Sequence, residues 1–131
     1  MLRLAGLVIF KSSLGWTDPQ DAIIDTGAHT SILPKWVWTL IEKQVTGSYY
    51  VRGLVPDPKC KMNVDVAWVT GALLDEAGNK TKEARFRAYL APTDEIPIVL
   101  GFKDLLEKFA VYFDFGERIA YHSPYPTSDI C

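Results

Sequence analysis

One carboxylate of this chain stands where an apolar strand ends in a turn of small residues. Residues 22–33 read Ala-Ile-Ile-Asp-Thr-Gly-Ala-His-Thr-Ser-Ile-Leu, so Asp25 closes an apolar run and the small residues Thr26, Gly27 and Ala28 follow it. A carboxylate at the end of a buried strand is costly unless partners satisfy it. Small turn residues would leave its oxygens open to solvent or a substrate, which makes Asp25 a candidate for acid–base chemistry. The alternative is an aspartate that caps its own turn.

A single such turn sets a condition on the mechanism. Hydrolysis by an activated water needs one carboxylate as base and a second as acid, and two neighbouring carboxylates that share a proton supply both. The chain contains no second Asp-Thr-Gly or Asp-Ser-Gly. The second carboxylate must therefore come from another copy of the chain, and we expect a homodimer with Asp25 of each subunit in the pair.

A second segment strengthens this interpretation. Residues 98–106 read Ile-Val-Leu-Gly-Phe-Lys-Asp-Leu-Leu, and the strand-like run 109–115 follows. Together with the Asp-Thr-Gly-Ala turn, this segment resembles the retropepsin-like aspartic proteases, single-lobe relatives of pepsin that include retroviral proteases. In that family the apolar-apolar-Gly segment packs beside the catalytic loop and leads into a short helix.

The resemblance implies both a fold and an activity. The fold would be all-β, the retropepsin-like acid protease fold, with a closed or partly closed β-barrel-like lobe and one or two short helices. The activity would be that of an aspartic endopeptidase that hydrolyses peptide bonds without a cofactor. In the family, the Thr26 hydroxyls would bridge the two loops and the Gly27 backbone would bind substrate. Gly101 would let the backbone pass close to its neighbour.

The resemblance also implies a set of substrate-binding residues. Segment 53–60 occupies the place of the family's flap, a hairpin that folds over bound peptide, although an ordinary surface loop is the alternative. The expected substrate-binding residues are Ala28, His29, Arg52, Gly53, Leu54, Val99 and Phe102, with Ile32 and Val55 as further apolar candidates.

Two positions depart from the family pattern. Many retroviral members pair an acidic residue, one position after the Ala of the loop, with an Arg that follows the Gly of the second segment. This chain has His29 and Phe102 there. Both members of that ion pair are absent together, which suggests that this chain packs the region in a different way. An inactive homologue would look similar. A non-catalytic dimer that binds peptide or serves assembly therefore remains the alternative. His29 either titrates near the cleft or, as is more common for an isolated polar histidine, is structural or solvated.

Periodicity predicts the elements that must position these residues. Alternating or continuous apolar runs indicate strands, and apolar residues at 33, 36, 37, 40 and 41 follow helical spacing after Pro34, with Gly47 as a stop. We expect strands at 2–11, 21–25, 48–55, 62–68, 86–90 and 96–100, a turn at 75–79, and helices between 34 and 47 and at 102–108.

Composition limits the remaining classes. With 131 residues and 48% hydrophobic content, the chain forms one domain, 1–131, with 122–131 as a loosely held tail. A net charge of −2 with scattered basic residues predicts neither a nucleic-acid nor a membrane partner. Cys60 and Cys131 belong to no ligand cluster, so we expect no metal, and reduced thiols. No targeting signal is evident, which predicts a cytoplasmic protein.

Overall fold

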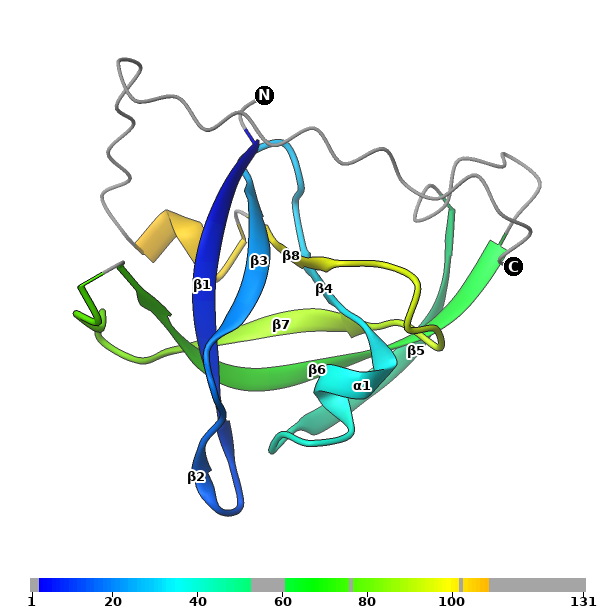
Figure 1. Cartoon of the computed structure of the whole chain (residues 1–131). Coiled ribbons are helices and arrows are strands. Elements are labelled where there is room, and N and C mark those ends of the chain that lie inside the picture. The colour runs from blue at the N-terminus through cyan, green and yellow to red at the C-terminus, as the bar shows by residue number, and fades with distance from the viewer. Residues whose placement is uncertain (1–2, 53–60, 76, 102, 109–131) are drawn as a thin grey trace.

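The computed structural model describes residues 3–52, 61–75, 77–101 and 103–108. These residues form eight strands, one α-helix and one short 3₁₀ helix (Figure 1). The strands are β1 (Arg3–Ser12), β2 (Gly15–Trp16), β3 (Gln20–Asp25), β4 (Ser31–Leu33), β5 (Gln44–Arg52), β6 (Lys61–Leu74), β7 (Ala84–Leu90) and β8 (Ile98–Leu100). The helices are α1 (Lys35–Trp38) and the 3₁₀ helix η1 (Leu106–Lys108).

The strands close into a barrel. Their order is β2-β1-β3-β8-β4-β7-β6-β5, and β1 pairs with β6 as well as with β3. Strands β1, β3, β8, β4, β7 and β6 therefore form a ring in which each strand has two neighbours. The predicted all-β, barrel-like fold with short helices is confirmed.

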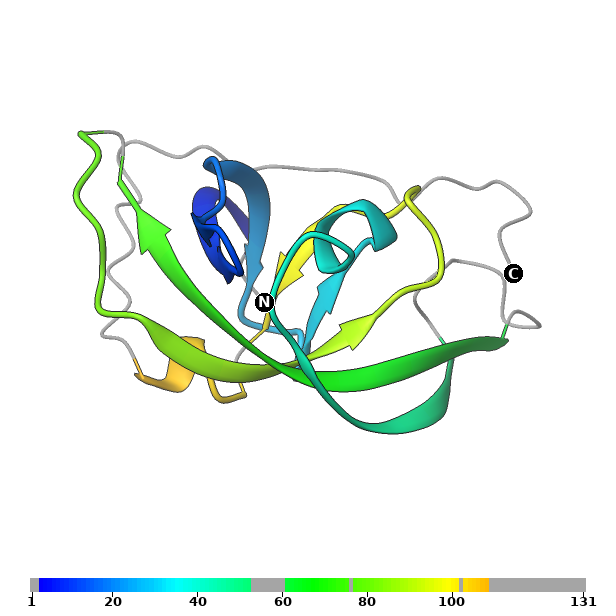
Figure 2. The ribbon, with the colours of Figure 1, turned by 90° about the horizontal axis from the view of Figure 1, so that it is seen from below.

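Strand β6 runs across the lobe and joins its parts (Figure 2). Its second half pairs with β1, from Leu74 opposite Leu7 to Gly71 opposite Phe10, and its first half forms a hairpin with β5. Strand β7 pairs with the central part of β6, where Val66 lies opposite Tyr89. A strand that contacts three others places residues from distant parts of the chain on one surface.

Alternation along β7 separates core from surface. Ala84, Phe86, Ala88 and Leu90 are buried, whereas Arg85 is exposed and Arg87 and Tyr89 are partly exposed. Phe86 packs against Phe10 of β1, with ring centroids 6.4 Å apart. Burial of such large aromatic side chains supplies much of the stabilisation of a small core. The predicted hairpin of β6 and β7 is confirmed.

The predicted helix between 34 and 47 is wrong beyond its first turn. Helix α1 ends at Trp38, and the Glu42 amide donates a hydrogen bond to the Lys11 carbonyl, which draws the chain toward β1. Strand β5 begins at Gln44, and Gly47 lies at a bulge in the β5–β6 pairing instead of a helix stop. Tertiary contacts thus override a local helical pattern.

Three further expectations need comment. Within the predicted strand at 96–100, β8 covers only Ile98–Leu100, and the predicted helix at 102–108 is reduced to the single turn η1. The short strand β4 was not predicted. The flap segment 53–60, the strand-like run 109–115, the tail 122–131 and both cysteines lie outside the described residues.

Gly101 stands where two segments cross at very short range. A Cβ atom placed there would lie 2.7 Å from the carbonyl carbon of Thr30, 2.9 Å from the oxygen of Ala28 and 3.0 Å from the nitrogen of Ser31. All three are backbone atoms, which cannot rotate away as a side chain can. The predicted close approach at Gly101 is confirmed, and only glycine fits there.

We therefore expect Gly101→Ala to lower the free energy of unfolding by about 1–3 kcal/mol, the usual cost of overpacking. Urea denaturation of the two proteins measures this difference. Gly47→Ala is the matched control, because the nearest atom to its added Cβ is in the Tyr49 side chain, at 3.3 Å. Equal destabilisation by both substitutions would contradict the crossing as the cause.

Candidate functional site

Asp25 is the last residue of β3, and its side chain is buried, with 3% of its surface exposed. The Gly27 amide donates a hydrogen bond of 2.9 Å to its Oδ1 atom. The Ala28 amide donates a bond of 3.2 Å to the Asp25 carbonyl, which closes the turn. The tight turn is therefore as predicted. The expectation that its carboxylate lies open is wrong for the single chain.

The hydrogen bond from Gly27 is the one that a turn-capping aspartate would make. It satisfies part of the hydrogen-bonding capacity of a carboxylate that burial would otherwise penalise. A cap alone does not require burial, however, since exposed Asp75 caps a turn by accepting bonds from the backbone and side-chain amides of Asn79. Asp25 thus combines a turn cap with a buried position at the end of a barrel strand.

The second segment lies beside this turn, as the resemblance implies. Strand β8 pairs in parallel with β3, with Leu100 opposite Ile24, one residue before Asp25. The Gly101 amide donates a 2.9 Å hydrogen bond to the buried hydroxyl of Ser31. The Lys103 amide donates a 2.8 Å bond to the His29 carbonyl. Gly101 and Lys103 are therefore tied to the loop after Asp25 by one bond to a side chain and one bond to the backbone.

The other predicted site residues are placed as follows. Thr26 and Ala28 are partly buried, Gly27 and His29 are exposed, and Val99 is buried in β8 opposite Ile23. Ile32 of β4 is partly buried and pairs with Val99. Arg52 ends β5, opposite Lys61 of β6. Gly53, Leu54, Val55 and Phe102 lie outside the described residues.

An ion pair bridges β7 to the turn that follows Gly101. Arg87 Nε lies 2.9 Å from Asp104 Oδ2. Burial acts to raise the pKa of Asp104, but the hydrogen bond and positive charge of Arg87 outweigh it and hold that pKa below its ordinary value. The same hydrogen bond raises the pKa of the Arg87 guanidinium. Asp104 has a φ of 64°, and its amide donates a 2.8 Å bond to Glu107 Oε1.

This bridge stands close to the positions where the family's acid–Arg pair is absent. His29 makes no ion pair within the described residues, but its ring Nδ1 lies 3.0 Å from the Thr30 hydroxyl. Arg87 and Asp104 tie the loop after β8 to the sheet by a charged contact instead. The structure thus contains a different brace for the same region.

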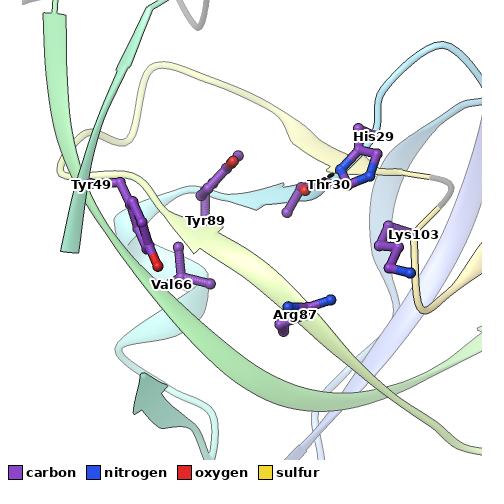
Figure 3. Close-up of a pocket in the computed structure, with 7 residues that line it drawn as sticks. All are labelled: His29, Thr30, Tyr49, Val66, Arg87, Tyr89 and Lys103. Atoms are coloured by element: carbon purple, nitrogen blue, oxygen red, sulfur yellow. Dashed lines mark hydrogen bonds between the residues drawn. The ribbon is translucent and has the colours of Figure 1, made fainter. Parts of the chain in front are cut away.

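A hollow of about 220 Å³ opens beside the loop that follows Asp25 (Figure 3). It is lined by His29, Thr30, Tyr49, Val66, Arg87, Tyr89 and Lys103. Sequence reasoning had named only His29 among these. The outward-facing polar residues of β7 could have indicated a polar surface there. Only the strand register and the hydrogen bond from Lys103 to His29 show that the lining residues share one hollow.

In the described part of the chain, no group of three or more His, Cys, Asp or Glu side chains lies together as a potential metal site. None of the helices in that part has the length and apolarity needed to cross a bilayer.

Comparisons with known proteins gave similarity at the level of structure. No protein-family model matches the chain, and no curated protein matches it. A solved structure of EIAV protease complexed with the inhibitor HBY-793 aligns with a TM-score of 0.45 and 21% sequence identity. The alignment covers 81% of this chain and 86% of that one.

The Arg87–Asp104 pair predicts a pH dependence of stability. Because the folded-state pKa of Asp104 is lowered, the ion pair contributes its full stabilisation above the unfolded-state pKa and loses it as the pH falls through the folded-state value. Asp104→Asn should lower the melting temperature by a few degrees at pH 7. The difference from wild type should shrink as the pH falls below the ordinary aspartate value of about 3.9 and through the lowered folded-state pKa, because Asp104 is then uncharged like the asparagine.

Asparagine suits this test because it tolerates a positive φ nearly as well as aspartate does. Asp18→Asn, at an exposed turn aspartate, controls for the loss of one negative charge. Melting curves by circular dichroism from pH 2 to 7 measure all three proteins. A deficit in Asp104→Asn that stays constant to pH 2 would show that the ion pair is not its origin.

Proposed function

We propose that this chain is an aspartic endopeptidase that acts as a homodimer and hydrolyses peptide bonds with a water activated by two Asp25 carboxylates, one from each subunit. The observation that carries the proposal is the position of Asp25. It ends a barrel strand in an Asp-Thr-Gly turn and lies beside the backbone crossing at Gly101. The turn and the crossing are the two elements on which the sequence resemblance rests.

The chemistry follows from two carboxylates sharing one proton. The ionised Asp25 takes a proton from the water, whose oxygen attacks the peptide carbonyl, while the protonated Asp25 of the other subunit donates to the carbonyl oxygen. On collapse of the tetrahedral intermediate, a proton passes to the leaving amine. Thr26 of each turn would link the two loops, and the Gly27 backbone would hold substrate.

The dimer is essential to this proposal. In the single chain Asp25 is 3% exposed. The proposal therefore requires that the second copy joins at this turn and that both carboxylates face one water-filled cleft in the dimer. Ala28, His29, Val99 and the β5–β6 hairpin with Arg52 would contribute to the substrate site. Gly53, Leu54 and Phe102 are proposed for it on the resemblance alone.

A non-catalytic dimer that binds peptide or serves assembly is the second candidate. It is favoured by the burial of Asp25 and by the hydrogen bond from Gly27, which give the carboxylate a structural role without any reaction. The two candidates differ in whether a bond is broken.

Casein digestion from pH 3 to 7 tests the proposal. We expect wild type to cleave casein, and Asp25→Asn to lower the rate by about 100-fold or more, the usual contribution of a general acid or base. A statine-type inhibitor, which mimics the tetrahedral intermediate, should block the wild-type reaction. Asp21→Asn is the matched control, because Asp21 is an exposed carboxylate on the same strand.

Sedimentation velocity of the same samples measures the dimer. Wild type should sediment as a dimer under the conditions in which it cleaves. A dimer that neither cleaves casein at any pH nor binds the inhibitor would overturn the protease proposal in favour of the second candidate. Cleavage that persists in Asp25→Asn would exclude the proposed mechanism.

A further inference from the structure

The hollow beside the candidate catalytic loop has an uneven charge. Among its seven lining residues, Arg87 and Lys103 are cationic and none is an aspartate or glutamate. The hydroxyls of Thr30, Tyr49 and Tyr89 add further hydrogen-bond donors. Val66 adds an apolar surface. A wall of donors and positive charge around one apolar contact suits a short acidic side chain.

The nearest acid does not cancel this charge toward the hollow. Asp104 engages only Nε of the Arg87 guanidinium in the ion pair, and a guanidinium has four other N–H donors. The Arg87 side chain is 43% exposed and that of Asp104 14%, so the cation is the more accessible partner. The Trp68 ring, with its centroid 5.2 Å from Arg87 Cζ, further holds the guanidinium in place.

The position of the hollow connects it with the proposed cleft. His29 and Thr30 follow the Asp25 turn directly, and the Lys103 backbone is bonded to that of His29. Figure 3 shows His29 and Lys103 on one side of the hollow, Tyr49 and Val66 on the other, and Arg87 and Tyr89 between them. An extended peptide lying across the Asp25 turn would pass its neighbouring side chains over this opening.

We propose that this hollow is a specificity subsite that takes the carboxylate of a glutamate or aspartate side chain of the substrate, bound by Lys103 and Arg87, a few residues from the scissile bond. This inference rests on the proposed function and adds a substrate class to it. Lys103 is the residue to test, because Arg87 also braces Asp104.

The first experiment uses peptides that wild type cleaves in casein, identified by mass spectrometry. Each flanking position is replaced in turn by Glu, Gln or Lys, and kcat/KM is measured. At one position we expect wild type to prefer Glu over Gln by about fivefold, as for a partly exposed ion pair. Lys103→Gln should weaken this preference, because Arg87 remains, and Lys103→Glu should abolish it.

Lys82→Glu is the matched control, since it makes the same charge change at an exposed residue outside the hollow. It should retain the wild-type preference for Glu. Equal rates with Glu and Gln at every position in wild type would overturn the subsite while leaving the protease proposal intact. An unchanged preference in both Lys103 variants would overturn it as well.

A second readout does not depend on cleavage. Amide NMR spectra of ¹⁵N-labelled Asp25→Asn protein are followed while capped Ala-Ala-Glu-Ala-Ala, its Gln counterpart or sodium acetate is added. We expect the Glu peptide alone to shift the Val66 and Tyr89 amides at low concentration, and the Lys103→Glu change to remove this response. An equal response to acetate would show a site for small free anions, and an equal response to the Gln peptide would exclude charge recognition. Either result overturns the proposal.

The two readouts separate the two proposals. Binding of the Glu peptide by a wild-type protein that cleaves nothing would retain the subsite and reject the protease. Cleavage by wild type without any response to the charge of the peptide would retain the protease and reject the subsite.

Discussion

The barrel depends on a backbone crossing at which a single methyl group has no room. Gly101 passes so close to residues 28–31 that an added Cβ would meet three backbone atoms within 3.0 Å. The two segments lie 70 residues apart, and the hydrogen bond from Gly101 to the Ser31 hydroxyl joins them inside the core. Strand β8 can then pair with β3 on one side and with β4 on the other, which closes the ring of strands.

The crossing also determines where the carboxylate of Asp25 lies. Strand β3 ends beside β8, so the Asp25 turn forms next to the crossing and its side chain is buried there. The Gly27 amide satisfies one oxygen. A carboxylate in this position caps the turn, and in the proposed dimer the same residue would act as the catalyst. The presence of a second carboxylate would distinguish a catalytic Asp25 from one that only caps its turn.

The sequence predicted the features that have a local physical cause. The Asp-Thr-Gly turn, the close approach at Gly101 and the alternation in β7 each follow from residue size or from period-two burial. The predicted helix after Pro34 was too long. The hydrogen bond from the Glu42 amide to the Lys11 carbonyl, which draws the chain toward β1, is a tertiary contact that a local pattern does not reveal. The short strand β4 was missed for a related reason, since three residues carry no periodicity and only their pairing with β7 and β8 defines them.

The hollow illustrates the same limit for the site. Tyr49, Val66 and Tyr89 reach it from three strands, and only their register shows that they share a face. The positions of His29 and Lys103, in contrast, follow from the crossing at Gly101. The backbones of His29 and Lys103 are bonded to each other two residues from Gly101, and the side chains of both line the hollow.

The crossing at Gly101 relates the proposed catalytic residue Asp25 to the proposed subsite residue Lys103. The loop that follows Asp25 and the segment that carries Lys103 pass each other closely at Gly101 and are joined by the hydrogen bond from Lys103 to His29. Arg87 lies on β7 next to Ala88, which pairs with Ser31 of the crossing, and its guanidinium contacts Asp104 and Trp68. Lys103 is joined to the loop after Asp25 more directly, because its amide donates a hydrogen bond to the His29 carbonyl. A substrate carboxylate bound to it would be placed relative to the reacting carboxylates by the crossing at Gly101.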